Sequence, residues 1–514
     1  MKKSPVKFFL SLGLLGAGAS MFIFWVMAHG PGRTSDSAVY IETAKSILAG
    51  NGFCIQGKPI THWPPFYPLI LAGSALLIPD IAQSVRYLHA IILGINVILI
   101  GLAFYISKER RIIVVVCAVL LFLFFPTTLL VHSTMWSEAP FIMFTLCGFL
   151  FLSLYFNNQN LPLLLASAIS LGLAMTIRYT GVVLMFPAIV TLIIFGHSYK
   201  RKKIFDIVIF MLIAAAPLCF WLFRNVLIAG NATNRRFAWH PISLENVKTL
   251  IMNISIFIIP ISMPIGIYIR FIFDVLFFVL VTAAFIITYR NNIHDQSIGQ
   301  PILVFPFLCF LFFLGYLIFI LISKCCFDAS IPLDERILFP AFVSLVIAVV
   351  GLAIPTFQYL QKSAIRRIFI VFLVIFAILN CIRGSLAAVK LREGVRFTSP
   401  EYKYYNSETI YILRKFPVNT EIYSNLAYSI NFLTDNKAVF LPFKKNPSTY
   451  IVNEHYKEEM ESICRYCRES KAIIVYFYLM RKWYLPTQEE IESTCNLHIL
   501  YKLSDGIIYT GRKE

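Results

Sequence analysis

Long apolar runs dominate this chain and limit what it can fold into. The first run, from Phe8 to Ala28, has about 20 residues, the length of one helix across a bilayer. Runs of the same kind recur along most of the chain. They begin near Phe8, Ser84, Arg111, Glu138, Leu161, Thr180, Ile204, Ile267, Pro301, Ile337 and Ile368. We therefore expect an α-helical polytopic membrane protein with about 11 spans.

Composition agrees with a membrane location. The chain is 58% hydrophobic and 14% charged, whereas soluble proteins average about 25% charged residues. The net charge of +18 would also suit a nucleic-acid partner, but many basic residues fall in short clusters between apolar runs. We therefore expect no nucleic-acid partner. The first run lacks a convincing small-x-small cleavage site, so we expect an uncleaved helix rather than a signal peptide.

The charge of the polar joints predicts which side of the membrane each one faces. Acidic or longer joints lie around Asp36, around Glu138, at 231–245 and at 328–334 and should face outward, whereas basic joints should be cytoplasmic. The basic joints are Lys2–Lys3, Lys108–Arg111, Lys200–Lys203, Tyr289–Arg290 and Lys362–Arg367. We expect a multi-pass protein of a bacterial inner (plasma) membrane, with its active site and C-terminal region on the outer face.

One apolar stretch conflicts with this alternation. Pro64–Ile78 has about 15 residues and begins with two prolines, which is short for a crossing. Counting it as a span would place Lys108–Arg111 outside. We therefore expect Tyr67–Ile78 to be a juxtamembrane or re-entrant helix, so that residues of about 29–83 form one outer loop. The segment Ile251–Ile265, broken by Pro260 and Pro264, can add a partial span.

The composition changes after Arg383. We expect residues 1–389 to form a transmembrane catalytic module and residues 390–514 a small extracytoplasmic soluble α/β domain. EYKYYNSETIYILRKF has the pattern of an amphipathic helix, and KAIIVYFY, HILYKL and the segment after LSDG have that of strands. This domain contains Cys464, Cys467 and Cys495. A disulfide and free thiols both remain open there, and a lone CxxC is weak evidence for a metal.

Asp36 is the leading catalytic candidate. It follows the first span and precedes an amphipathic helix that also carries Tyr40, which we include in the binding site. Ser35 or Asp36 can simply cap that helix. Glu138, at a second outer joint, can likewise be a favourable charge at a helix N-terminus. If the two carboxylates converge on one outward cavity, they can supply a general base and position a substrate hydroxyl.

Single arginines near the predicted outer ends of spans form the second group of candidates: Arg86, Arg178, Arg224 and Arg336. Each can snorkel toward lipid phosphates, but four on one side also fit an anion pocket, because a guanidinium matches phosphate geometry. His62, in the first outer loop, is a candidate for binding phosphate or metal, whereas aromatic-belt anchoring explains the neighbouring Trp63.

The chain carries no recognisable nucleotide-binding or hydrolase motif such as a Walker loop, GxGxxG or HExxH. No nucleotide cofactor is therefore expected, while dependence on a divalent metal ion stays open. One alternative function is a transporter or flippase of a lipid-linked glycan. Transporters tend to show repeated halves and ionisable groups near the bilayer midplane. The sequence shows neither feature.

The ordered motifs of the N-terminal region resemble the GT-C glycosyltransferases, in particular the protein O-mannosyltransferases, lipid A aminoarabinose transferases and their bacterial relatives. The resemblance covers roughly residues 31–340. The motifs are SDSAVYIETAKSILAGNGF and HWPPFYPLILA in the first outer loop, then SVRYL, SEAPFIMF, MTIRYTG, WLFRNVLIAGN and DERILFPAF.

This resemblance implies inverting transfer of a sugar from a polyprenyl-phosphate donor to a hydroxyl of a lipid, glycan or protein acceptor outside the cytoplasm. Asp36 falls at the family's catalytic acidic position, and Glu138 at its second acidic position, where many members have Asp. Arg86 and Arg336 match arginines near span starts, with Arg336 close to the carrier phosphate. Arg178 stands where aminoarabinose transferases tend to have lysine.

Overall fold

The structure is a computed structural model that describes residues 5–55, 57–106, 112–258, 266–294, 301–359, 363–393, 407–418, 420–434 and 436–511. The predicted basic joints Lys2–Lys3 and Lys108–Arg111 lie outside these residues, as does Lys362. The predicted break at Pro260 and Pro264 also lies outside them.

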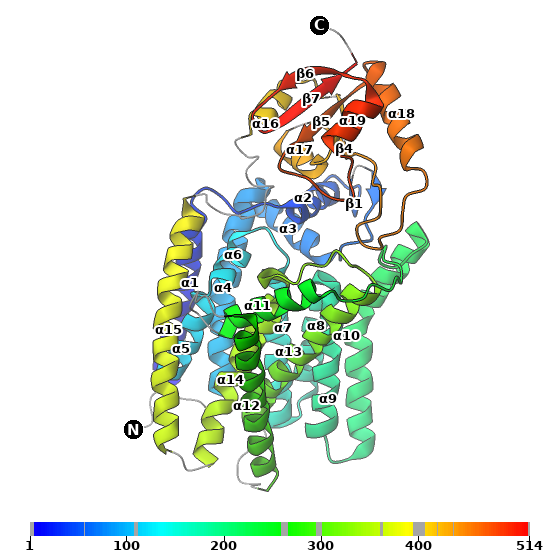
Figure 1. Ribbon diagram of the computed structural model, residues 1–514. Helices are drawn as coiled ribbons and strands as arrows, with labels where there is room; N and C mark the ends of the chain where they lie inside the picture. The colour runs from blue at the N-terminus through cyan, green and yellow to red at the C-terminus, as the bar shows by residue number, and fades with distance from the viewer. Residues whose placement is uncertain are drawn as a thin grey trace.

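A bundle of long helices makes up most of the molecule (Figure 1). Its helices are α1 (Pro5–Val26), α4 (Ile81–Ile106), α5 (Ile112–Leu123), α6 (Pro126–Ser133), α7 (Glu138–Asn158), α8 (Leu161–Ile177), η1 (Tyr179–Leu184), α9 (Met185–Phe195), α10 (Lys200–Ala229), α11 (Leu244–Ile258), α12 (Ile267–His294), α13 (Pro301–Cys326), α14 (Glu335–Tyr359) and α15 (Ser363–Arg392). Glycines allow close packing where α1 meets α4. A Cβ on Gly94 would lie 2.8 Å from the Gly16 carbonyl oxygen, so only a hydrogen side chain fits this crossing.

The long helices of the bundle include the membrane spans. Each predicted span begins inside or directly beside one of these helices. Within the described residues, seven helices are long and apolar enough to cross a membrane, or eight if the pair α5 and α6, bent by 59°, forms one broken span. The predicted count of about 11 is not confirmed.

The first outer loop folds into short elements at one end of the bundle. These are α2 (Ser35–Leu48), the two-stranded hairpin of β1 (Cys54–Ile55) and β2 (Lys58–Pro59), and α3 (Phe66–Leu77), which packs against α2. Helix α3 has 12 residues, too few to cross a bilayer. It therefore agrees with the prediction of a non-crossing helix in this segment. The basic run Lys200–Lys203, which begins α10, lies at the opposite end of the bundle (Figure 1).

A small sheet covers the end of the bundle that carries α2 and α3 (Figure 1). Its strands have the order β4-β3-β5-β7-β6, with β3 parallel to β4 and β5, and with β7 antiparallel to β5 and β6. The elements are α16 (Glu408–Leu413), β3 (Glu421–Ser424), α17 (Ala427–Leu433), β4 (Ala438–Phe440), α18 (Tyr456–Arg468), β5 (Ala472–Phe477), α19 (Gln488–Cys495), β6 (His498–Lys502) and β7 (Gly506–Thr510).

The central strand β5 explains the two small cores of this C-terminal region. Ile473, Val475 and Phe477 join the core on one face, and Ile474 and Tyr476 join the core on the other. This alternation follows from the two-residue repeat of a strand, and burial on both faces explains its unbroken apolar sequence. The predicted α/β composition is confirmed. Helix α15 continues to Arg392, past the predicted domain boundary at 389.

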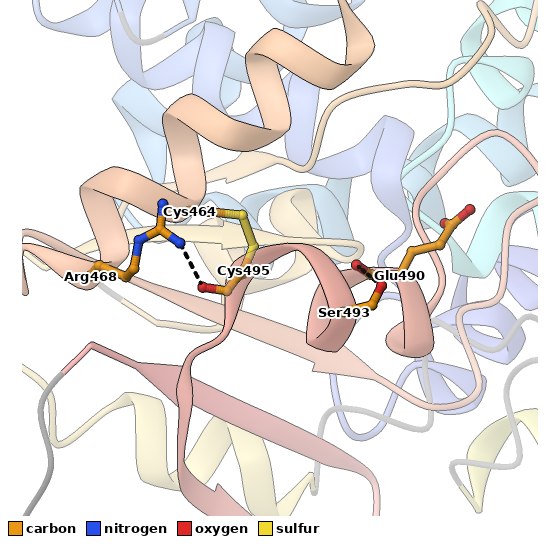
Figure 2. The surroundings of a disulfide bond; sticks show 5 residues. All are labelled: Cys464, Arg468, Glu490, Ser493 and Cys495. Carbon is orange, nitrogen blue, oxygen red and sulfur yellow. Dashed lines mark hydrogen bonds between the residues drawn. A yellow bond between two sulfur atoms is a disulfide. The ribbon is translucent and has the colours of Figure 1, made fainter.

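A disulfide joins Cys464 of α18 to Cys495, the last residue of α19, and leaves Cys467 buried as a free thiol. Figure 2 shows the bond and the Arg468 guanidinium, whose Nη1 donates to the Cys495 carbonyl oxygen at 3.2 Å. Of the alternatives left open by the sequence, the structure shows a disulfide, and it does not use the CxxC spacing.

Removing this disulfide should destabilise the C-terminal region. The two cysteines are 31 residues apart, and closing a loop of that length stabilises a fold by about 3–4 kcal/mol in the chain-entropy description. We expect Cys464→Ser to lower the thermal unfolding midpoint of the sheet region, measured by resistance to protease during heating. Cys219→Ser on α10 is the matched control, because Cys219 is an exposed free thiol. Equal midpoints for the two variants would contradict this prediction.

Candidate active site

Backbone hydrogen bonds join the segments that precede α2 and α7, at the end of the helix bundle that carries α2. Gly32 and Thr134 form a parallel bridge, in which Gly32 N–H donates to the Ser133 carbonyl oxygen at 2.7 Å and Met135 N–H donates to the Gly32 carbonyl oxygen at 2.9 Å. The Ser37 hydroxyl donates to the Met135 carbonyl oxygen at 3.0 Å. These bonds fix the start of α2 beside the start of α7.

The bridge brings the two predicted carboxylates into one cluster. Asp36 lies in the first turn of α2 and Glu138 in the first turn of α7, where the helix dipole favours negative charge. The residue that caps α2 is Thr34. The interpretation of Ser35 or Asp36 as this cap is therefore wrong, and the Asp36 carboxylate is available for other contacts.

Arg336 connects the two carboxylates. Its Nη2 lies 2.7 Å from Asp36 Oδ2, and its Nε donates to Glu138 Oε1 at 2.7 Å. Arg178, the residue after α8, places Nη1 2.6 Å from the same Glu138 oxygen and 3.3 Å from the Ser137 hydroxyl. Two arginines and two carboxylates thus form one ion-pair network in which the formal charges balance.

The flat face of the Arg336 guanidinium also contacts an aromatic ring. It lies over the Trp136 ring, with Cζ 4.0 Å from the ring centroid, and the Trp136 indole N–H donates to the Thr34 hydroxyl at 2.9 Å. A cation over an aromatic face is attracted by the ring quadrupole. Arg336 lies in the first turn of α14, where the helix dipole disfavours a positive charge. The carboxylates and the ring therefore supply the attraction that keeps it there.

The two carboxylates differ in how much of each side chain is exposed. The Asp36 side chain is 32% exposed and lines a cavity of about 460 Å³, together with Arg178 and Arg336. The Glu138 side chain is 0% exposed and lies behind the two arginines, outside the cavity lining. The structure therefore brings both predicted acidic residues to the cluster, but only Asp36 faces the cavity.

The lining of the cavity divides into charged and apolar side chains. Asp36, Arg178 and Arg336 are charged, and α13, α14 and the loop that joins them contribute apolar side chains. The apolar residues are Phe319, Ile320, Ile322, Phe327, Ile331 and Ile337. A ligand with a charged group and a hydrocarbon chain matches this division.

Tyr40 and His62 also line this cavity. The Tyr40 hydroxyl lies 3.3 Å from the Ser137 hydroxyl, and burial, with the Asp36 charge, raises the pKa of its phenol, so the phenol stays protonated. Burial, with the nearby Arg235 charge, lowers the pKa of His62 to about 4. His62 is therefore neutral at pH 7 and offers a phosphate a hydrogen bond rather than a charge.

The lowered pKa of His62 predicts a pH effect on stability. In the unfolded chain the histidine has a pKa of about 6.5, so it is protonated below that pH. In the folded protein His62 stays neutral until the pH falls to about 4, so between these values the unfolded state binds more protons. The His62 contribution to the free energy of unfolding is therefore constant above pH 6.5 and falls as the pH drops toward 4. We expect the thermal unfolding midpoint to fall more steeply over this window in the wild type than in His62→Asn. Identical slopes would contradict the assignment.

Two of the predicted arginines lie outside the cavity lining. The Arg86 guanidinium lies over the Phe24 ring, 3.8 Å from its centroid, and donates to the Phe24 carbonyl oxygen at 3.3 Å. Arg224 donates to the Ile60 carbonyl oxygen at 2.9 Å and so fastens the first outer loop to α10. Of the four arginines that were predicted to form an anion pocket, only Arg178 and Arg336 line the cavity.

The cavity contains a second ion pair, which was not predicted from the sequence. Arg235 and Asp328 both line it, with Arg235 Nε 3.7 Å from Asp328 Oδ2. The sequence does contain a feature that could have indicated Arg235. Arg235 and Arg236 are adjacent arginines in a joint that was predicted to face outward, which runs against the positive-inside bias. No group of three or more His, Cys, Asp and Glu side chains in the described part of the chain is arranged to hold a metal ion.

Comparisons with known proteins support the same fold. The family described as dolichyl-phosphate-mannose-protein mannosyltransferase matches residues 62–221. The structure of ArnT from Cupriavidus metallidurans in the apo state has a TM-score of 0.60 at 12% identity, covering 99% of both chains. Bound to undecaprenyl phosphate, ArnT has a TM-score of 0.58 at 11% identity, covering 100% of this chain and 99% of that one. No curated protein matches by sequence.

A third structure extends the comparison. The Archaeoglobus fulgidus oligosaccharyltransferase tethered with an acceptor peptide has a TM-score of 0.53 at 11% identity and covers 98% of this chain and 74% of its own. The chain is therefore an integral, multi-pass membrane protein with the GT-C glycosyltransferase fold. The sequence similarity to the protein mannosyltransferases is limited to residues 62–221, and the similarity to ArnT is one of fold.

Proposed function

We propose that the chain is a membrane glycosyltransferase that moves a sugar from a polyprenyl-phosphate donor to a hydroxyl group of an acceptor. One observation carries the proposal. A partly exposed carboxylate, Asp36, and two arginines line the same cavity as apolar side chains of α13, of α14 and of the loop between them. The donor phosphate fits the arginines, and its hydrocarbon chain fits the residues of α13 and α14. Undecaprenyl phosphate, which the ArnT structure binds, is a ligand of this chemistry.

Asp36 acts as the general base. The acceptor oxygen attacks the anomeric carbon and forms the new glycosidic bond, while the acceptor proton passes to the Asp36 carboxylate. The bond between the anomeric carbon and the phosphate oxygen breaks, and the polyprenyl phosphate leaves with that electron pair. A single displacement of this kind inverts the configuration at the anomeric carbon.

Arg336 couples the base to the leaving group. While Asp36 is ionised, one end of the Arg336 guanidinium is paired with it at 2.7 Å. When Asp36 takes the acceptor proton, this pairing weakens at the moment when negative charge develops on the phosphate. Arg336 and Arg178 can then stabilise the leaving group. Glu138, fully buried, is a positioning residue that holds both arginines.

We further propose that the site and the C-terminal region face the outside of a bacterial plasma membrane. The Cys464–Cys495 disulfide is of a kind that persists in oxidising compartments. The basic run at the start of α10 lies at the other end of the bundle, which suits the cytoplasmic side. Both observations favour the same orientation.

The test is incubation of the purified protein with a panel of polyprenyl-phosphate sugars and three acceptor classes, a glycan, a lipid alcohol and a Ser/Thr peptide. Mass spectrometry then identifies the products. We expect a glycosylated acceptor and free polyprenyl phosphate in equal amounts. A transporter or flippase of a lipid-linked glycan would move the donor across vesicles without forming product, and that outcome would refute the proposal.

A further inference from the structure

A second cavity, of about 430 Å³, lies between the first outer loop and the C-terminal sheet. Its lining runs from Lys58 to Trp63 on one side and includes residues of α17 and β4 on the other. It shares His62 and Trp63 with the cavity that contains Asp36. Helix α17 also packs against α2, the helix that carries Asp36. One pair of side chains therefore separates the second cavity from the catalytic one.

The lining of the second cavity combines aromatic rings with hydroxyl and amide groups. Trp63 meets His62 edge-on at 4.6 Å between ring centroids, and Tyr428 meets Phe440 in the same way at 4.9 Å. Thr61, Asn234 and Asn431 supply polar groups. The C–H faces of a sugar pack on aromatic rings, and its hydroxyl groups both donate to and accept from hydroxyls and amides. This combination suits a saccharide.

An extended peptide fits the second cavity less well. Strand β4 is at the edge of the sheet, where a peptide can add as a further strand if backbone groups are free. The Asn431 side chain already occupies that edge, because its amide nitrogen donates to the Ala438 carbonyl oxygen at 2.9 Å and its oxygen accepts the Ala438 N–H. An amide group thus stands where the peptide backbone would pair.

The charge of the lining does not suit a strongly anionic ligand. Among the lining residues that the structure describes, Lys58 is a cation and His62 is neutral at pH 7, and no arginine contributes. Phosphate-binding sites usually use arginine forks or several cations. These described residues include no carboxylate either, so a cationic ligand lacks a partner among them.

We propose that the second cavity binds the acceptor and that the acceptor is a saccharide, one of whose hydroxyl groups passes the His62–Trp63 pair to reach Asp36. This inference rests on the glycosyl transfer proposed above and names its acceptor class. The saccharide hydroxyl is the nucleophile of that displacement, and its proton passes to Asp36. Tyr428 lines the second cavity, and burial, with the Asp36 charge, raises the pKa of its phenol, so the protonated hydroxyl can donate a hydrogen bond.

The first test measures binding without turnover. Full-length protein in lipid nanodiscs is applied to an array of immobilised oligosaccharides built from hexoses, pentoses and hexosamines. Val439→Arg is the blocking variant, because Val439 lines the cavity and is 45% exposed, so the longer side chain enters the cavity with little loss of packing. Val418→Arg is the matched control, since Val418 is 60% exposed in the same region and lies outside the lining.

We expect the wild type and Val418→Arg to bind the same oligosaccharides, and Val439→Arg to bind them roughly ten-fold more weakly, because the arginine side chain occupies part of the cavity. No bound oligosaccharide, or binding that Val439→Arg leaves unchanged, would overturn the inference. With the acceptor panel above, transfer to the peptide or lipid alcohol but not to the glycan would also overturn it and leave glycosyl transfer standing. Saccharide binding that Val439→Arg weakens, with no transfer from any donor, would refute the proposed function and leave the saccharide site standing.

Discussion

Asp36→Asn should reduce sugar transfer by about 10²–10⁴-fold while the protein stays folded and inserted. Asparagine keeps the size of the side chain but cannot take the acceptor proton. It also replaces the charged partner of Arg336, 2.7 Å away, with a neutral amide. The measurement is the initial rate of product formation at saturating donor and acceptor, with the thermal unfolding midpoint recorded on the same preparation. Near-normal turnover would remove Asp36 from the mechanism.

Glu138→Gln is the matched comparison for Asp36→Asn, because it changes the second carboxylate of the same cluster in the same way. Glu138 is fully buried and accepts from both arginines through Oε1. Its loss leaves two buried guanidinium groups with one carboxylate, which is destabilising. We expect a lower unfolding midpoint and a raised donor KM, whereas Asp36→Asn should mainly lower kcat. The same kinetic pattern in both variants would contradict the division of roles.

Arg336→Gln should lower kcat/KM for the donor by about 10²–10³-fold, the size of a lost charge-stabilising group. The substitution removes the contacts to Asp36 and Glu138 and the position over the Trp136 ring together. Breaking a buried ion pair from one side also costs about 3–5 kcal/mol of stability. Rates measured with each substrate varied in turn should show the donor KM rising more than the acceptor KM. Equal effects on both would count against a phosphate role.

Arg86→Gln is the control for Arg336→Gln. Both arginines were predicted from the same sequence signal, but Arg86 contacts Phe24 and lies outside the cavity lining. We expect Arg86→Gln to change donor kinetics by no more than about a few-fold, because Arg86 touches neither the cavity nor the ion-pair network of Asp36 and Glu138. A loss as large as that of Arg336→Gln would instead restore Arg86 to the phosphate site.

Much of the fold is predictable from sequence because its signals are local. The length of an apolar run indicates a helix in lipid whatever surrounds it, and each predicted span starts in or beside an observed helix. Short segments rich in β-branched and aromatic residues likewise predict the strands β5, β6 and β7. The α5–α6 bend of 59° was not predicted, although Pro126 lies at the break between the two helices.

The candidate site is only partly predictable. Residue type and position select Asp36, Glu138, Arg178 and Arg336, and the structure brings these four together. The same reasoning also selects Arg86 and Arg224, which meet an aromatic ring and a backbone carbonyl instead. A sequence shows that an arginine lies at a helix end, but it does not show which way the helix turns that side chain.

The membrane class, the helices, the α/β character of the C-terminal region and the residue types available for chemistry all follow from the sequence, because hydrophobic length and periodicity are properties of short segments. Which charges meet depends instead on the tertiary structure. The Gly32–Thr134 bridge and the Arg336–Asp36 pair join segments far apart in the chain. It also decided that Asp36 faces the cavity while Glu138 is buried behind the arginines. Burial depends on every helix packed around a group, so it could not be read from the residues on either side.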